Sequence, residues 1–144
     1  EVRLRYAYNI QCDQVIKDAS GQIIELKCTY DPESRHGGKK VKGIIHWVSA
    51  AHAQAVPVRL YDRLWTVEEP TGDVATELNP HSLEMLPAAQ VEPAVAAMGP
   101  GDRCQFERLG YFIVDAKDSR PGAPVFNRIV GLKDSWAKVV GKNK

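Results

Sequence analysis

Two arginines, Arg3 and Arg5, are the first side chains in the chain whose type and spacing suggest a chemistry. On an extended strand, residues two positions apart point to the same side, so both guanidinium groups would share one face. A guanidinium group is a rigid fork of donors that fits phosphates and base edges. The pair predicts a contact surface for nucleic acid, although the solvated face of an ordinary strand would carry the same residues.

A second group of polar side chains lies in the segment 105–108, QFER. In a regular strand, Gln105 and Glu107 share one face and Arg108 lies on the other. The glutamine amide both donates and accepts, so it can read a base edge. A β-bulge near Leu109-Gly110 would bring Gln105 and Arg108 together. The alternative is a barrel strand whose polar residues face solvent.

A basic loop, residues 35–42 (RHGGKKVK), combines clustered positive charge with glycines. Such a loop can hold phosphates, because lysine and arginine neutralise backbone charge. A solvated surface loop is the alternative. The candidates for contacts to an RNA backbone are Arg5, Lys39, Lys40 and Lys42.

No catalytic residue and no metal site are predicted. The phosphate-binding pattern GxxxxGK[ST], the dinucleotide pattern GxGxxG and the nucleophile pattern GxSxG do not occur. His46 and His52 are six positions apart, without a neighbouring cysteine or paired carboxylate. They are interpreted as structural or surface histidines rather than ligands.

Charge limits the kind of partner. The 144 residues carry 19 basic and 18 acidic side chains, and the sequence pI is about 8.0. Non-specific DNA binders are usually more basic, so recognition of a nucleic acid must rest on a few placed side chains, and a DNA partner is not expected. No stretch approaches the roughly 20 apolar residues needed to span a membrane, so a membrane partner is not expected either. Hydrophobic residues make up 44% and charged residues 26%, as in soluble globular proteins.

The three cysteines, Cys12, Cys28 and Cys104, are odd in number and widely scattered. This argues against a disulfide framework and suits a reducing cytosol. We expect Cys12 and Cys28 to be small buried apolar side chains.

Alternating apolar residues and turn signals predict many short strands and an all-β fold, an antiparallel barrel or sandwich with one or two short helices. Segment 68–73 (EEPTGD) is read as a linker with a subdomain boundary, 88–98 as a loop or short helix, and Asp134 as the cap of a helix containing Trp136. The strands are expected at 2–10, 22–30, 41–48, 56–67, 103–108, 111–116 and 125–132, and a turn at 79–82 leads into residues 83–86.

Four long segments carry a family resemblance, and the opening EVRLRYAY (1–8) fits it too. The segments are KVKGIIHWVSAAHA (40–53), VRLYDRLW (58–65), CQFERLGYF (104–112) and VFNRIVGLKDSWAK (125–138). Together they resemble, in order and over nearly the whole chain, the C-terminal region of glutamine–tRNA ligases. The related glutamate–tRNA ligases share the barrel plan, but their sequences resemble the segments VSAAHA and FERLGYF less closely.

This resemblance implies a fold and a role. The fold would be two anticodon-binding β-barrels related to a ribosomal 5S RNA-binding protein: residues 1–68 the distal barrel, 69–140 the return strands of the proximal barrel, and 141–144 a tail. Gln105 and Arg108 match family residues that line the pocket for the middle anticodon base, a uridine. Arg3 matches the arginine that contacts the first anticodon base. Contacts to the third base, and the first strands of the inner barrel, are expected to precede Glu1.

The implied partners are the anticodon loop of a glutamine tRNA and an upstream catalytic domain of the same chain, in the cytoplasm. In the family that domain uses ATP and Mg²⁺; its HIGH and KMSKS motifs do not occur here, so these 144 residues are expected to be non-catalytic and without a cofactor. Other interpretations are the anticodon-binding region of a glutamate–tRNA ligase, a free-standing RNA-binding barrel, or a structural barrel that does not bind RNA.

Overall fold

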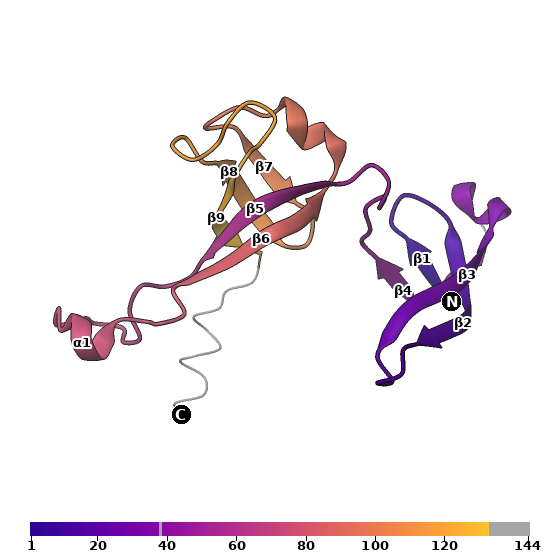
Figure 1. The fold of residues 1–144 in the computed structure, drawn as a ribbon, viewed down its shortest axis with the longest axis horizontal. Coiled ribbons are helices and arrows are strands. Elements are labelled where there is room, and N and C mark those ends of the chain that lie inside the picture. Colours follow the sequence, from indigo (N-terminus) through magenta and orange to yellow (C-terminus); the bar gives the residue numbers. More distant parts are fainter. Residues whose placement is uncertain (38, 133–144) are drawn as a thin grey trace. The chain divides into compact units, whose positions relative to one another are not determined.

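A computed structural model describes residues 1–37 and 39–132 (Figure 1). The chain folds into two compact units, Glu1–Val48 and Ser49–Lys144, and each is described by itself. Within the described residues, no helix has the length and apolar character needed to cross a membrane.

Unit 1 is a small mixed sheet with strand order β3-β2-β1-β4. Strands β2 and β3 form a long antiparallel hairpin, whereas β1 pairs in parallel with β4. The 3₁₀ helix η1 follows β3, and the side chain of Asp31 caps it by accepting from the backbone of Glu33. The elements are β1 (Val2–Leu4), β2 (Asn9–Lys17), β3 (Ile23–Asp31), η1 (Pro32–His36) and β4 (Gly43–Ile45).

The single strand predicted over residues 2–10 is wrong, because a tight turn separates β1 from β2. The amide of Leu4 donates to the carbonyl of Tyr8 at 2.9 Å, and the amide of Ala7 donates to the carbonyl of Leu4 at 2.9 Å. Tyr6 takes a left-handed φ of 59°. Apolar alternation survives across the turn because β2 returns antiparallel to β1, so periodicity alone could not reveal the reversal.

Unit 2 is built on a sheet of strand order β6-β5-β9-β8-β7. Neighbours pair antiparallel except β5 and β9, which are parallel. The elements are β5 (Gln54–Tyr61), α1 (Val74–Glu77), β6 (Leu83–Val91), η2 (Pro93–Ala97), β7 (Arg103–Phe106), β8 (Gly110–Val114) and β9 (Phe126–Gly131).

One apolar core holds unit 2 together. Phe106 packs on Phe112 and Phe126, with ring centroids 4.4 and 5.0 Å away. Burying aromatic side chains of this size contributes a few kcal/mol each, roughly 3–5 kcal/mol on truncation to alanine. The buried members of the core are Val56, Val58, Val91, Val95, Phe112, Val114 and Phe126.

The mostly-β fold with few short helices is confirmed, with differences in detail. Parallel pairs occur in both sheets, so the sheets are mixed rather than antiparallel. Segment 88–98 divides between the end of β6 and η2. The expected boundary after residue 68 falls inside unit 2, and the assignment to distal and proximal barrels stays a prediction. The helix expected after Asp134 and the tail 141–144 lie outside the described residues.

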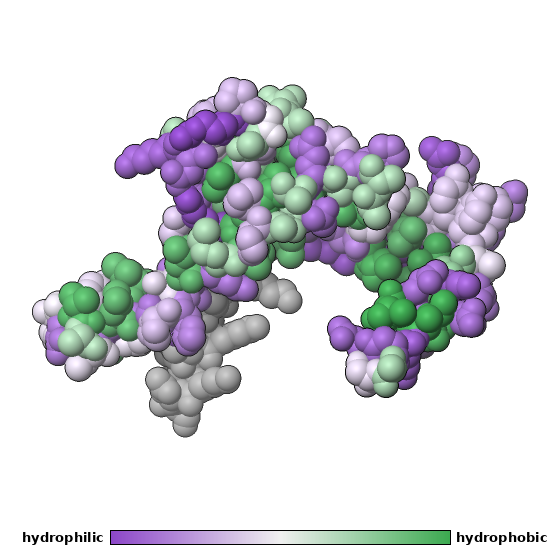
Figure 2. All heavy atoms as spheres, viewed as in Figure 1, coloured by the Kyte–Doolittle hydropathy of each residue, from purple (hydrophilic) through white to green (hydrophobic). Residues whose placement is uncertain are grey.

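The expected burial of Cys12 and Cys28 is also wrong. Both thiols are exposed, because the β2–β3 hairpin is solvent-accessible along most of both strands. Figure 2 shows apolar side chains at the surface of unit 1, and Ile23, Ile24 and Leu26 of β3 are more than half exposed. A mixture of polar and apolar residues in a strand therefore did not indicate a buried face here.

Candidate nucleic-acid interface

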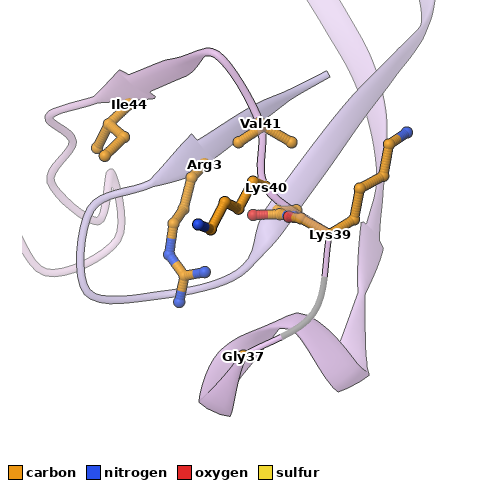
Figure 3. A pocket seen from close by; sticks show the side chains of 7 residues that line it. Arg3, Gly37, Lys39, Lys40, Val41 and Ile44 are labelled. Atoms are coloured by element: carbon orange, nitrogen blue, oxygen red, sulfur yellow. The ribbon is translucent and has the colours of Figure 1, made fainter.

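Unit 1 contains a half-open pocket of about 350 Å³ beside the start of its sheet. Its wall combines cations with apolar groups, and a pocket of this size can hold a small ligand. Figure 3 shows Lys40 directed towards Arg3, whereas Lys39 extends the other way. The lining residues are Arg3, Asn9, Gly37, Lys39, Lys40, Val41 and Ile44.

The pocket wall is fixed by buried polar contacts between β2 and η1. The amide of Asn9 donates to the hydroxyl of Ser34 at 2.8 Å, and that hydroxyl donates to the carbonyl of Asp31. Asn9 and Ser34 are almost fully buried. The Asn9 side chain donates to the carbonyl of Lys39 at 2.9 Å, which ties the basic loop to the sheet. Its Oδ1 is buried and has no hydrogen-bond partner within residues 1–37 and 39–132.

Three cations surround the pocket, and they differ in how they are held. The Arg3 guanidinium donates to the carbonyl of Arg35 at 3.2 Å, so one edge of the fork is anchored. Lys39 forms an ion pair with Glu1 at 2.5 Å, and the hydrogen bond to that carboxylate raises the pKa of the lysine. Lys40 is exposed. Cations beside the apolar side chains of Val41 and Ile44 suit a nucleotide, whose phosphate is anionic and whose base is flat and apolar on its faces.

Arg5 and Lys42 lie apart from this pocket wall. Arg5 is half-buried at the β1–β2 turn, where its guanidinium donates to the Tyr6 hydroxyl at 3.3 Å and its carbonyl accepts from the indole of Trp47 at 3.0 Å. The turn thus separates Arg5 from Arg3, against the expectation of a shared strand face. Lys42 is exposed just before β4.

Gln105 and Arg108 lie on the β7–β8 hairpin of unit 2. Gln105 is exposed near the end of β7, opposite Tyr111 of β8. Phe106 ends the strand and turns inward to the core. A tight turn follows, in which the amide of Leu109 donates to the carbonyl of Phe106 at 2.9 Å. This turn lies at the position where a bulge was predicted. Gln105 and Arg108, three positions apart in the sequence, therefore lie at the same end of the hairpin.

Arg108 takes an unusual backbone conformation in this turn. Its φ is 67°, a region that side chains other than glycine, asparagine and aspartate rarely adopt. The third position of a turn closed by an i to i+3 hydrogen bond normally takes glycine when φ is positive. Strain of this kind persists where the surroundings impose it and clusters at functional sites. The conformation therefore marks Arg108 as a functional candidate on structural grounds as well.

Gly110 fixes the base of the same hairpin. A Cβ atom on this residue would lie 2.5 Å from the carbonyl oxygen of Val130 on β9, closer than real Cβ contacts allow. The close approach of the β8 and β9 backbones thus requires glycine, and it holds the turn that carries Arg108 against the sheet.

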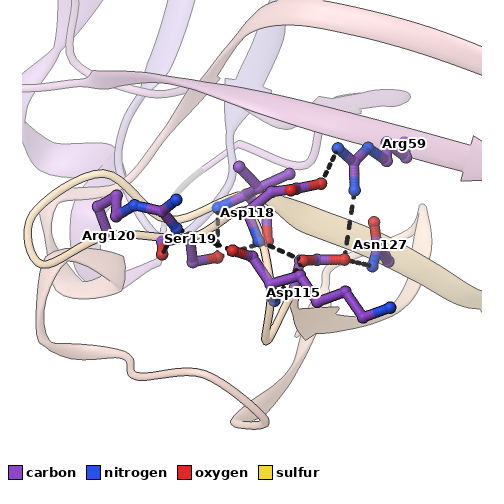
Figure 4. Close-up of polar contacts among 8 residues, drawn as sticks. Arg59, Asp115, Asp118, Ser119, Arg120 and Asn127 are labelled. Carbon is purple, nitrogen blue, oxygen red and sulfur yellow. Dashed lines mark hydrogen bonds and ion pairs between the residues drawn. The ribbon is translucent and has the colours of Figure 1, made fainter.

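An ion-pair network of unit 2 was not foreseen from the sequence (Figure 4). The Arg59 guanidinium donates to Asp115 at 3.2 Å and to Asp118 at 2.5 Å, and the Asn127 amide donates to Asp115 at 2.6 Å. The amides of Lys117 and Asp118 donate to the other Asp115 oxygen, each at 2.8 Å. The hydrogen bonds from the Asp118 backbone and the Asn127 side chain are the main reasons that the pKa of Asp115 falls to about 2.

Comparison with known families places these features in context. Two family models match, at residues 1–31 and 44–115, and both are described as the anticodon-binding domain of class I tRNA synthetases (E and Q).

Curated relatives resemble nearly the whole chain. A glutamine–tRNA ligase of Rhodopirellula baltica is 54% identical over 99% of the chain, and one of Nitrobacter winogradskyi is 52% identical over 96%. A glutamine–tRNA ligase of Pseudomonas aeruginosa is 49% identical over 96% of the chain. The chain spans only about a quarter of the length of these relatives, 25% of the first and 26% of the other two.

Proposed function

The chain belongs to the class I tRNA synthetase family (E and Q), in its anticodon-binding domain, and we propose that it reads the anticodon loop of a glutamine tRNA within a glutamine–tRNA ligase. The observation that carries this proposal is the identity of about half the residues, over nearly the whole chain, with three glutamine–tRNA ligases. Each of these relatives is a glutamine enzyme, so the glutamate–tRNA ligase alternative is not favoured.

The unit 1 pocket is proposed as the contact site for the first anticodon base. Anticodon bases are single-stranded, so they can be splayed into pockets and read at their edges. Arg3 is anchored at one side by the carbonyl of Arg35, which leaves other donors of its fork for the base. Lys40 is proposed as the contact to the adjacent phosphate.

The β7–β8 hairpin is proposed as the reader of the middle base, a uridine. Uridine offers one N–H donor and two carbonyl acceptors. The amide of Gln105 can satisfy the donor and one carbonyl, and Arg108 can donate to the remaining carbonyl or the phosphate. The exposure of Gln105 and the left-handed turn at Arg108 support this assignment. Losing one such contact should cost roughly 1–3 kcal/mol.

The remaining functions belong to the proposed parent enzyme. An upstream catalytic domain would attach glutamine to the tRNA with ATP and Mg²⁺, in the cytoplasm. The described residues contain no group of three histidine, cysteine or acidic side chains placed to hold a metal ion. The chain's own contribution is to bind and orient the anticodon loop.

Binding of the full-length protein to a glutamine tRNA, and to a copy with its middle anticodon base changed, tests this proposal at one stated salt concentration. Wild type is expected to prefer the unchanged tRNA by about tenfold or more, which corresponds to the loss of about 1–3 kcal/mol at one base. Arg108→Ala is expected to remove this preference. If wild type binds both tRNAs equally, the middle-base assignment is wrong.

The matched control is Arg120→Ala. The Arg120 guanidinium donates to the carbonyls of Lys117 and Ser119 in its own loop, away from the β7–β8 turn. This variant should keep the wild-type preference. If Arg108→Ala weakens both tRNAs equally, Arg108 contacts phosphate and does not read the base.

A further inference from the structure

Two of the three cysteines lie directly opposite each other on neighbouring strands. Cys12 of β2 and Cys28 of β3 are cross-strand partners in the antiparallel hairpin. Directly paired residues in such a hairpin have Cα atoms about 4.5–5.5 Å apart. Disulfides span Cα distances of about 4.4–6.8 Å, so the backbone already meets the main geometric requirement.

The local contacts of the two thiols leave both of them accessible. Both are exposed, and each makes one long contact to a carbonyl of its own strand, Cys12 to Gln14 at 3.7 Å and Cys28 to Leu26 at 3.9 Å. Neither is held in a core that a reagent would have to open.

The hairpin can adjust at this point. The strand register shifts between Cys12 and Gln14, so Asp13 is an extra residue in β2. A bulge locally twists and loosens a strand pair, which lets the sulfur atoms approach a bonding geometry. Partial desolvation raises the pKa of Cys28, and the neighbouring Cys12 and Asp13 raise it further. Because both thiols are exposed, either one can make the first attack on a small disulfide and the other can then displace it.

We propose that Cys12 and Cys28 form a reversible cross-strand disulfide, formed by exchange with a low-molecular-weight disulfide such as oxidised glutathione. The thiolate of one cysteine attacks one sulfur of the glutathione disulfide and releases one glutathione thiolate. The thiolate of the other cysteine then attacks the protein sulfur of the mixed disulfide and releases the second glutathione. Two protein thiols are oxidised and one glutathione disulfide is reduced to two thiols, so atoms and electrons balance.

The disulfide would join the hairpin that supports the unit 1 pocket. Strand β2 begins at Asn9 in the pocket wall, and β3 ends at Asp31, which caps η1. The bond would fix the relative position of these two strands. The chemistry of this site rests on the hairpin alone and does not depend on the proposed RNA-binding function.

The test is a redox titration of the full-length protein in glutathione buffers, followed by alkylation, proteolysis and mass spectrometry. Within the hairpin, the second cysteine competes with reduced glutathione for the mixed disulfide, at an effective concentration of about 1 mM or more. At ~0.1 mM reduced glutathione, the linked Cys12–Cys28 peptides should therefore exceed the mixed disulfides by about tenfold. The fraction of linked peptide should follow the equilibrium of a reaction that releases two glutathione thiols. The linked peptide should disappear when a reductant is added. Separate glutathione adducts at both cysteines without a linked peptide would overturn the proposal.

Single substitutions separate this bond from general thiol reactivity. In Cys12→Ser and in Cys28→Ser, the remaining cysteine should carry one glutathione and form no link within the hairpin. Cys104→Ser should leave the linked fraction unchanged, because Cys104 lies in unit 2 against the core. Cross-linking of Cys12 or Cys28 only between two molecules would contradict the assignment to one hairpin.

Discussion

At the residue scale, Arg108 combines a proposed contact with a backbone conformation that disfavours its side chain. A left-handed φ costs an ordinary L-residue about 1–2 kcal/mol. Its φ of 67° lies in the turn after β7. Such a cost is tolerated when function requires a long donor side chain at the turn. Backbone and side-chain roles can be separated by comparing two truncations at the same position.

We expect Arg108→Gly to be more stable than Arg108→Ala by about 1 kcal/mol, because glycine relieves the left-handed strain and alanine keeps it. Both variants should lose discrimination at the middle anticodon base, because both lack the guanidinium. Urea unfolding measures the first expectation, and tRNA binding measures the second. Equal stability of the two variants would show that the turn carries no strain.

Asp115 should give unit 2 an acid-sensitive component of stability. Its pKa is about 2 in the folded chain and 3.8 for an ordinary aspartate, because the native hydrogen bonds favour the charged form. The stabilisation is therefore fully present above about pH 4 and is lost as pH falls towards 2. Asp115→Asn should be less stable than wild type at pH 7, and the difference should shrink below pH 4.

The pH dependence is measured by urea unfolding of wild type and Asp115→Asn at several pH values. Asp102→Asn serves as the control: its carboxylate accepts from the amide of Gly99 at 2.8 Å and has no ion pair among residues 1–37 and 39–132. A stability difference for Asp115→Asn that stays constant from pH 7 to pH 2 would contradict the assigned cause.

The site residues show what the sequence could predict at this scale. Gln105, Arg108 and Arg3 were singled out by their types and spacing, which also fit a solvated surface, and their roles at the anticodon were predicted from the family resemblance and stay predictions. Asn9 was missed, since a polar residue in an alternating strand carries no sign that it will be buried beside a pocket. Arg59 and Asp115 were missed because 56 positions separate two residues that only the sheet topology brings together.

At the scale of elements, η1 and the start of β2 are joined by one hydroxyl group. Ser34 is fully buried, accepts from the amide of Asn9 and donates to the carbonyl of Asp31. Removing its hydroxyl would leave a buried amide without its partner, which costs about 1–3 kcal/mol. The same helix supplies the Arg35 carbonyl that anchors Arg3.

We therefore expect Ser34→Ala to destabilise unit 1 by about 1–3 kcal/mol and to speed hydrogen exchange at the amides of Asn9 and its strand neighbours. Hydrogen exchange read by NMR or mass spectrometry measures both. Ser20→Ala is the matched control, because Ser20 is exposed in the turn between β2 and β3. Unchanged protection at Asn9 in Ser34→Ala would rule out this role.

The bounds and the pairing of the strands show which features sequence patterns could predict and which they could not. The β2–β3 hairpin was predicted in outline, since turn residues separate two runs of strand-forming residues. The reversal between β1 and β2 was not, because its hydrogen bonds involve backbone groups that every residue carries and Tyr6 is an unusual residue for a left-handed position. The parallel pairs β1–β4 and β5–β9 depend on which strands meet in space, and no local pattern reports this.

At the scale of the whole molecule, the charge is nearly balanced. A formal net charge of +1 gives little general attraction to RNA, so binding should depend on single placed cations. The salt dependence of the affinity shows how many cations contact phosphates. Each phosphate contact to a single strand contributes about 0.7 to the slope of log K against log salt concentration. Cations that read a base and cations that hold a phosphate should therefore respond differently.

We expect Lys40→Ala in the full-length protein to reduce the steepness of this slope by about 0.7 while leaving discrimination at the middle anticodon base unchanged. Lys39→Ala should change the slope less, because Glu1 already pairs with Lys39 and offsets its charge. Lys17→Ala, at the end of β2 and outside the pocket wall, is the control and should match wild type. Equal slopes for Lys40→Ala and Lys17→Ala would mean that the pocket does not contact the phosphate backbone, and recognition by unit 1 would then rest on Arg3.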